Sequence, residues 1–209
     1  MKHLFLLCAL LLTLQSVDAQ KRSTTKPSTK QSKGTTAVSQ QPENPQKGFV
    51  VIETSMGNIT IQLNDSAAPK HSANFRKLAK DGYYDSTTFH RVIPNFMIQG
   101  GDPNSRAGER HTHGMGGPEY RIDAEIGLTH ERGVIAAARQ GDQINPQKMS
   151  NGSQFYITVV PTNFLDGQYS VFGKVVEGMD VADSIVAVPR DPRDNPLEKV
   201  LIKKMTVIE

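Results

Sequence analysis

Arg91 is the residue of this chain whose type and setting point most directly to chemistry. It stands among large apolar residues in the segment 89–103 (FHRVIPNFMIQGGDP), where Gln99 is the nearest amide. A guanidinium group cannot shed its charge and is costly to bury without a partner, so an arginine is uncommon in an apolar run of this kind. An arginine and an amide that face one apolar pocket can donate hydrogen bonds to a bound molecule. We therefore expect a binding or catalytic face here and not plain core.

Two short strands are expected to position this arginine and its neighbours. Alternation places three side chains on one face of the first strand: Phe89, Arg91 and Ile93. Pro94 then interrupts the pattern, and Met97 and Gln99 share a face of the following strand. The pattern predicts that both strands present these side chains to one pocket.

The rest of the chain after residue 47 is patterned mainly as short strands. Apolar–polar alternation between turn signals predicts strands over residues 49–53, 58–63, 88–92, 97–100, 120–123, 133–138, 155–159, 169–175 and 200–208. One helix is expected to start at a cap of Asp65 or Ser66, with Pro69 in its first turn, and to end at Gly82, and a second helix spans 180–186. This is a mainly β fold, and the pattern alone leaves barrel and sandwich open.

The first 47 residues divide into two segments that precede the expected domain. Residues 1–19 combine a positive start, an apolar core over 4–14 and a small-residue cleavage site, which is the pattern of a signal peptide. Residues 20–47 are rich in Ser, Thr, Gln, Lys and Pro and have almost no large apolar residue, which predicts a disordered basic linker. We therefore expect an exported protein of the periplasm or a secretory compartment, held at a membrane only if the signal segment is retained.

The charge of the chain is unevenly distributed. The whole chain carries +3, the linker 20–47 carries +5 and the segment 1–19 is neutral, so residues 48–209 carry −2. A weakly acidic domain lacks the basic surface on which nucleic-acid binding depends, so we expect no nucleic-acid partner. The remaining residues suffice for one domain with a sizeable core, and a monomer is the default expectation.

Five segments of the domain form an ordered set. They are FVVIETSMGNITIQL from Phe49, APKHSANFRKLAKDGYYD from Ala68, FHRVIPNFMIQGGDP from Phe89, NGSQFYIT from Asn151 and NFLDGQYSVFGKVV from Asn163. This set resembles the cyclophilins, the peptidyl-prolyl cis/trans isomerases, over residues 48–209. The resemblance implies a closed eight-stranded antiparallel barrel capped by two α-helices. It also implies an enzyme that isomerises X-Pro bonds without a cofactor or metal.

The resemblance assigns the central catalytic role to Arg91. Rotation about an X-Pro bond meets a barrier of about 18–20 kcal/mol, because the bond to the prolyl nitrogen has partial double-bond character. Twisting the bond frees the lone pair of that nitrogen, so a donor beside it stabilises the twisted state more than either planar state. The arginine of the family's FHR motif is that donor and falls on Arg91, and Phe96 and Gln99 are implied as catalytic residues with it.

Eight further residues are implied to bind the substrate. They are Met97, Phe164, Leu165 and Tyr156 in the proline pocket, Gln154 on the substrate backbone, Ala138 and Arg139 along an extended peptide, and Tyr169 at the rim. Phe164, Tyr169 and Arg139 stand where many members carry Trp, His and Asn. Such replacements are frequent in bacterial-type members, so we expect an exported, bacterial-type cyclophilin that cyclosporin inhibits weakly. The alternatives are an arginine paired with a surface acid, apolar residues that merely pack, and glutamines that only satisfy loop carbonyls.

Several histidines and an acidic residue invite other interpretations. His111 and His113 have a spacing that suits two metal ligands on one strand face, and His130 is a third candidate. No acidic or cysteine partner is placed with them, so solvated loop histidines are expected and no metal site. Asp166, which precedes Gly167, is interpreted as a turn residue and not as a catalytic acid.

Three functions are weighed on these grounds. The first is an isomerase that assists the folding of exported clients by acting on their Pro-containing segments. The second is a chaperone that only binds such segments, and the third is a lipocalin-like carrier barrel. Arg91 favours the isomerase, since a binder needs only the apolar pocket and the amides. The bulky strand residues are sufficient to fill a small barrel, which disfavours a carrier with an open lumen.

Overall fold

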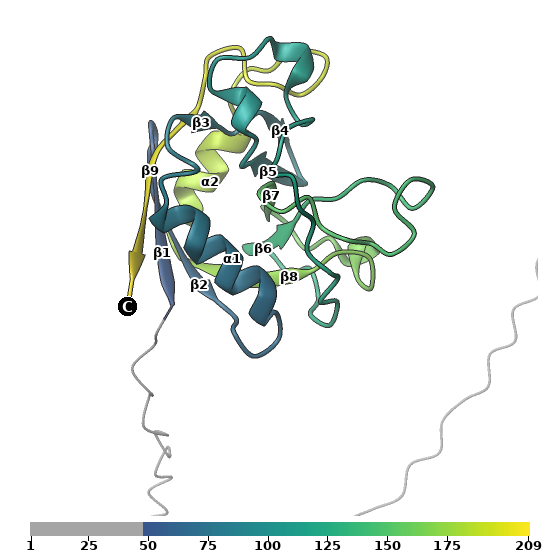
Figure 1. The fold of residues 1–209 in the computed structure, drawn as a ribbon. Coiled ribbons are helices and arrows are strands. Elements are labelled where there is room, and N and C mark those ends of the chain that lie inside the picture. Colours follow the sequence, from purple (N-terminus) through teal and green to yellow (C-terminus); the bar gives the residue numbers. More distant parts are fainter. Residues whose placement is uncertain (1–47) are drawn as a thin grey trace, which may run out of the picture. The chain divides into compact units, whose positions relative to one another are not determined.

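The strands of residues 48–209, the part of the chain that the computed structural model describes, form a single curled antiparallel sheet (Figure 1). Its nine strands are β1 (Phe49–Thr54), β2 (Gly57–Leu63), β3 (Thr87–Thr88), β4 (Arg91–Ile93), β5 (Met97–Gly100), β6 (Val134–Ala137), β7 (Phe155–Thr158), β8 (Val171–Glu177) and β9 (Leu201–Ile208). Two α-helices accompany them, α1 (Pro69–Lys80) and α2 (Met179–Val186). The expected signal peptide (1–19) and linker (20–47) lie outside the described residues. Within the described part, no helix has the length and apolar character needed to cross a bilayer.

The sheet closes into a barrel through its two edge strands. The strand order is β3-β9-β1-β2-β8-β6-β7-β5-β4, and only Phe89 and His90 separate β3 from β4 in the chain. The Phe89 N–H donates to Val200 O beside β9, and the His90 N–H donates to Gln99 O on β5, so residues 87–93 join one edge to the other. Counted as one interrupted strand, β3 and β4 make the barrel eight-stranded, which confirms the expected fold class. Closure removes the exposed edges that an open sheet presents.

The interior of the barrel is a packed apolar core. Its fully buried members from the strands and their joints include Ile52, Ile59, Ile61, Phe89, Ile98, Ile135, Phe155, Ile157 and Ile202. Phe75 of α1 and Ile185 of α2 belong to the same cluster, so each helix buries one face against the barrel. The rings of Phe75 and Phe155 meet edge-on with centroids 5.5 Å apart, a favourable aromatic geometry. A core filled in this way argues against the carrier alternative.

The expected cap of helix α1, Asp65 or Ser66, is wrong. The N-cap residue is Ala68, whose side chain has no capping atom. The backbone N–H groups of residues 70 and 71 donate instead to the two carboxylate oxygens of Glu125, each at 3.0 Å. A carboxylate distant in the sequence therefore performs the function of a local cap and also lies favourably at the positive end of the helix dipole.

The expected strand over residues 120–123 is also wrong. This segment forms one isolated bridge, in which Ile122 and Ser150 exchange backbone hydrogen bonds of 3.2 and 2.8 Å. The neighbouring Tyr120 hydroxyl donates to Asn74 Oδ1 at 2.6 Å, so the segment is fastened to α1 and not to a strand. The strand predicted over 88–92 is divided into β3 and β4 by Phe89 and His90, whereas the remaining predicted strands and both helices are confirmed, with shifts of one or two residues at most strand ends.

Candidate active site

The predicted functional side chains meet on the outer face of the barrel wall. The register of β4 and β5 pairs Arg91 with Gln99 and Ile93 with Met97, and Gln99 pairs in turn with Tyr156 on β7. Paired residues of neighbouring strands point to the same side of a sheet. These side chains therefore share a face outside the packed interior.

A second apolar cluster, separate from the interior core, forms the floor of this face. Its buried members are Met97, Val134, Ala136, Tyr156 and Val171, and Ile93, Phe96, Leu128, Ala138, Leu165 and Tyr169 pack against it. The strands thus bury apolar side chains on both faces, one against the interior and one beneath the site. The two-faced burial explains why the segment around Arg91 is apolar almost throughout.

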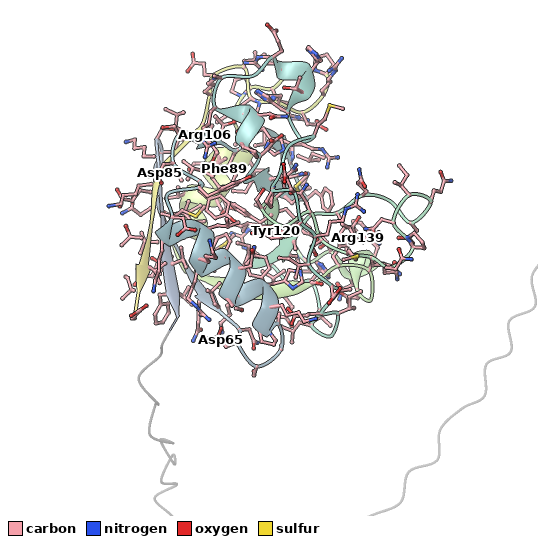
Figure 2. All side chains as sticks on the ribbon, in the orientation of Figure 1. Asp65, Asp85, Phe89, Arg106, Tyr120 and Arg139 are labelled. Carbon is pink, nitrogen blue, oxygen red and sulfur yellow. The ribbon has the colours of Figure 1, made fainter. Side chains whose placement is uncertain are left out.

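The expectation that Phe89 shares a face with Arg91 is wrong. Phe89 is fully buried in the interior core, whereas Arg91 is exposed. The chain passes from β3 to β4 at Phe89 and His90, and this interruption shifts the alternation. Figure 2 shows Phe89 within the barrel.

A pocket of about 180 Å³ opens over the second cluster. It is lined by Arg91, Phe96, Met97, Gln99, Ala138, Arg139, Tyr156, Leu165 and Tyr169, which are nine of the eleven residues predicted from the sequence. They come from β4, β5 and β7, from the end of β6, from the 3-10 helix η3 (Asn163–Leu165) and from the segment before β8. The structure therefore gathers residues from these six segments around one cavity.

Arg91 lies at the edge of this pocket, and few groups of the described residues bind its guanidinium. Its hydrogen bond within the described residues is a long one, 3.4 Å from a terminal guanidinium nitrogen to Gln99 Oε1. No carboxylate of the described residues forms an ion pair with it, which removes the alternative of an arginine paired with a surface acid. Most of the donors of this cation are therefore available to a ligand.

Two glutamines connect Arg91 to a second depression. Gln99 Nε2 donates to Gln154 Oε1 at 3.0 Å, and Gln154 Nε2 donates to the carbonyls of Gly114 and Gly116 at 3.0 and 2.8 Å. Gln154 lies in a groove of about 440 Å³ that adjoins the pocket. The Gln154 amide nitrogen thus satisfies loop carbonyls, as the alternative interpretation expected. Its oxygen meanwhile fixes the orientation of Gln99.

Phe164 does not line the pocket, contrary to the expectation. It is 73% exposed, and its ring contacts the outer side of Phe96 with centroids 5.6 Å apart. Leu165, the next residue, supplies the apolar wall instead. Phe164 therefore shields Phe96 from solvent at the rim.

The Arg139 side chain braces the pocket wall, a role that the resemblance did not imply. Its side chain is only 4% exposed and donates to Gln168 O at 2.8 Å and to Gln140 O at 2.9 Å. It also pairs with Asp142 at 2.6 Å and lies 4.7 Å from the centroid of the Tyr169 ring. Figure 2 shows Arg139 where the chain leaves β6. Its donors are committed within the protein, so the side chain stiffens the pocket wall.

His130 contradicts the expectation of a solvated loop histidine. It is fully buried, and its Nδ1 lies 2.9 Å from Asp166 Oδ1 and its Nε2 2.9 Å from the Tyr156 hydroxyl. The hydrogen bond from His130 lowers the pKa of the Asp166 carboxyl, and burial raises the pKa of the Tyr156 phenol well above its usual range. Asp166 is thus more than a turn residue. Its partner is 36 positions away, so no local pattern could reveal the contact.

His71 forms a second buried chain of the same chemical type. Its Nδ1 lies 2.6 Å from Glu125 Oε2 and its Nε2 2.8 Å from the Ser150 hydroxyl. Burial lowers the pKa of His71 in spite of the carboxylate beside it, which keeps the imidazole neutral. A cavity beside it holds about 20 Å³, which is too small for a substrate. This chain therefore anchors helix α1 and is no hydrolytic site.

Two of the histidines considered as metal ligands have other hydrogen-bond partners in the structure. His113 bonds through its ring to Gly108 O at 3.2 Å and to Asn195 Nδ2 at 2.8 Å, while His130 is held by the contacts given above. Within residues 48–209, no cluster of three or more His, Cys, Asp or Glu side chains has a geometry that could hold a metal ion.

Comparison with known proteins bears on this geometry. The family model of cyclophilin-type peptidyl-prolyl cis-trans isomerases matches residues 49–207. A peptidyl-prolyl cis-trans isomerase-like 1 of Neurospora crassa is 42% identical over 160 residues, which cover 76% of this chain and 93% of the relative. A peptidyl-prolyl cis-trans isomerase of Schizosaccharomyces pombe is 39% identical, over 76% of this chain and 98% of its own. These relatives are fungal, so they give no support to the expected bacterial-type, exported qualifier.

Solved structures show the same fold. A cyclophilin-type peptidyl-prolyl cis-trans isomerase of Cryptosporidium parvum, crystallised in the presence of the dipeptide Ala-Pro, superposes with a TM-score of 0.69 at 32% identity. It is covered over 99% of its length and covers 77% of this chain. A second structure of the same protein gives a TM-score of 0.70 at 33% identity, over 78% of this chain and 98% of its own. The matching part of this chain thus corresponds to almost the full length of the solved relative.

Proposed function

The chain belongs to the cyclophilin family of peptidyl-prolyl cis-trans isomerases, and on this premise we propose that Arg91 is the catalytic donor of its isomerase reaction. One observation carries the proposal: an exposed guanidinium, with a single long hydrogen bond to Gln99 among the described residues, stands beside an apolar pocket. An always-charged group with unused donors at such a place is suited to a transient acceptor.

The proposed step is rotation about the X-Pro bond. As the bond twists, the prolyl nitrogen regains its lone pair, and an N–H of Arg91 donates to it. A hydrogen bond to a charged group contributes about 1.5–3 kcal/mol. Since about 1.4 kcal/mol corresponds to a tenfold change in rate, this bond accounts for roughly one to two orders of magnitude. The pocket must supply the rest by holding the ring while the carbonyl side of the bond rotates.

The proposed substrate is a Pro-containing polypeptide segment. The prolyl ring is placed over Met97 and Tyr156, with Phe96 and Leu165 as walls, and Gln99 and Gln154 beside the substrate backbone. The Cryptosporidium relative was crystallised in the presence of Ala-Pro, which supports this class of ligand.

An extended peptide is proposed to lie along the segment after β6. The Ala138 N–H already donates to Gln154 O, and the Ala138 carbonyl accepts from the Asn151 N–H. The peptide backbone would therefore pair with the next residue, Arg139.

We further propose that the chain is exported and acts as a monomer on exported clients. The support is the signal-peptide pattern of residues 1–19, which precede the family match. Mass spectrometry of the protein from the exported fraction of its host tests the proposal: an N-terminus at Gln20 agrees with it, and an intact Met1 in an internal fraction contradicts it. Light scattering of the purified chain tests the monomer.

The catalytic proposal is tested by exchange NMR of an X-Pro peptide with the full chain. We expect Arg91→Ala to lower the catalysed exchange rate at least about tenfold while the peptide still binds. Arg76→Ala is the matched control, because Arg76 is an arginine of α1 whose partner is Asp65 and which does not line the pocket. Equal rates for Arg91→Ala and the unaltered chain would overturn the role of Arg91.

The second candidate is a chaperone that binds Pro-containing segments and turns them over slowly. Its support is the 440 Å³ groove beside the pocket, which has room for residues other than proline. Peptide binding by the unaltered chain without faster exchange would favour this candidate over the isomerase.

A further inference from the structure

The proline pocket combines strands that backbone ladders join with one wall, the 3-10 helix η3, that takes part in none of the strand pairings among the described residues. Its floor residue Tyr156 belongs to β7, whereas its wall residue Leu165 belongs to the 3-10 helix η3. Asp166 directly follows Leu165 and ends that helix. The distance between floor and wall, and hence the width of the pocket, depends on what fastens η3 to the barrel.

His130 connects η3 to the barrel. Its backbone carbonyl accepts from the Thr162 N–H at 2.7 Å, immediately before η3. Its backbone N–H donates to Asp166 Oδ1 at 2.7 Å, and its ring Nδ1 lies 2.9 Å from the same oxygen, immediately after η3. Its Nε2 lies 2.9 Å from the Tyr156 hydroxyl. One buried residue thus holds both ends of the wall and the floor.

The directions of these hydrogen bonds follow from the groups involved. The Asp166 carboxylate only accepts, so Nδ1 of the His130 ring donates to it, and in the uncharged form of an imidazole Nε2 is then an acceptor. The Tyr156 hydroxyl therefore donates to Nε2. Its hydrogen points away from the pocket, and the pocket receives the apolar ring of the tyrosine.

The aromatic rings around this chain of hydrogen bonds also pack against one another. The His130 ring lies nearly parallel to that of Tyr156, at an interplanar angle of 10° with centroids 6.1 Å apart. The Tyr169 ring stands edge-on to both, with centroids at 6.3 Å from His130 and 5.7 Å from Tyr156. The chain Asp166–His130–Tyr156, here called the pocket relay, is thus confined on its flank by Tyr169.

We propose that His130 and Asp166 are positioning residues that set the width of the proline pocket and thereby its preference for a five-membered ring. The inference rests on the proposed function, because it takes the 180 Å³ pocket to be the site of the prolyl ring. Neither residue lines the pocket, so both act through Tyr156 and Leu165.

The preference for a five-membered ring can be probed with a proline analogue that has a larger ring. Pipecolic acid differs from proline by one methylene in its ring. One methylene too many in a fitted apolar pocket costs about 10–200-fold in specificity. A pocket of fixed width rejects the larger ring, and a pocket whose wall can move accepts it more readily.

The experiment compares the acceleration of prolyl and pipecolyl forms of one peptide by the full chain, using exchange NMR. We expect the unaltered chain to favour the prolyl form by at least about tenfold. Asp166→Ala should lower this preference to within about threefold of unity. Asp166→Asn, which keeps an oxygen acceptor for His130, should restore most of it.

A second variant and a matched control keep the test decisive. Tyr156→Phe removes only the hydroxyl that ties the floor to His130, so it should lower the preference by a smaller factor, even if Asp166→Ala does not fold. Glu125→Ala breaks the equivalent chain at His71, away from the pocket, and should weaken folding without changing the preference.

The outcomes separate the two proposals. An unchanged ring preference in folded Asp166→Ala, or in Tyr156→Phe where the former does not fold, overturns the positioning role and leaves the isomerase proposal intact. A preference that falls equally in Glu125→Ala overturns it as well, because general loosening then explains the effect. Normal activity of Arg91→Ala refutes the catalytic proposal alone, since the ring preference is measured independently of it.

Discussion

Two buried chains of this molecule have the same chemistry and different positions. In the pocket relay, Asp166 and the Tyr156 hydroxyl hold His130; in the second chain, here called the helix relay, Glu125 and the Ser150 hydroxyl hold His71. Each is a carboxylate, an imidazole and a hydroxyl in sequence. The carboxylate of the helix relay also accepts from the first turn of α1, and the hydroxyl of the pocket relay belongs to a residue of the pocket floor.

The comparison shows that the attached elements, and not the groups themselves, decide what such a chain does. Glu125 accepts from the backbone of residues 70–71, so the helix relay stabilises a helix end. Asp166 accepts from the backbone of His130 and follows Leu165, so the pocket relay aligns a wall with a floor. The same hydrogen bonds thus contribute to the free energy of unfolding in one place and to substrate selection in the other.

The largest effect is expected from Glu125→Ala. The change leaves two helix N–H groups and the buried His71 ring without their acceptor, so the free energy of unfolding should fall by about 2–4 kcal/mol. Urea unfolding followed by circular dichroism measures it. Glu125→Gln, which retains an oxygen acceptor, should lose less, and a loss below about 1 kcal/mol in Glu125→Ala would show that the cap matters little.

The next test asks whether the residues of a relay act together, by comparing the ring preference of single and combined variants. Residues of one hydrogen-bonded network have non-additive effects, whereas independent sites add. The combined variant Asp166→Ala/Tyr156→Phe should therefore have nearly the ring preference of Asp166→Ala alone. In Glu125→Ala/Tyr156→Phe the preference should equal that of Tyr156→Phe. Multiplied losses in the first pair would mean that Asp166 and Tyr156 act separately.

Acid should weaken the helix relay. The pKa of His71 is lowered by burial, so the unfolded chain binds more protons as the pH falls below the ordinary histidine pKa of about 6.5. Its contribution is complete above that pH and declines below it. Burial tends to raise the pKa of Glu125, but hydrogen bonds from His71 and the helix backbone outweigh it and leave that pKa lowered, which adds a loss below pH 4.5.

The urea midpoint measured against pH checks this expectation. His71→Gln cannot be protonated, so its midpoint should change less between pH 6.5 and 5 than that of the unaltered chain. Parallel curves for the two proteins would place the acid sensitivity elsewhere. His90 is one such place, since burial lowers its pKa to about 4.

The smallest effects are expected from removing single hydroxyl groups. Ser150→Ala and Tyr156→Phe each leave one imidazole nitrogen without its donor, so each should lower the free energy of unfolding by about 0.5–1.5 kcal/mol. Only Tyr156→Phe should also change the ring preference. Thermal unfolding and the paired peptide assay distinguish the two, and a changed preference in Ser150→Ala would remove the contrast between the relays.

Much of the fold and of the site could be predicted because the signals are local. Strand alternation and turn residues predicted the hairpin of β1 and β2 and the strands β5, β6 and β7 within one or two residues. Nine of the eleven predicted site residues line one pocket, because they lie on contiguous motifs whose strands pair in a fixed register. The errors at Phe89 and at the 120–123 segment arose where the chain leaves a regular strand, which alternation cannot follow.

The sequence by itself thus determined most of the strands through local alternation, and the resemblance of its five ordered segments implied the family, the barrel and nine of the residues that line the pocket. The tertiary structure alone decided the cap of α1 and both relays. Their imidazole and carboxylate partners are 54 and 36 residues apart, and a hydrogen bond requires its atoms to be placed within a few tenths of an ångström. Only the closed barrel, which fixes β7, η3 and the start of α1 relative to one another, supplies that precision.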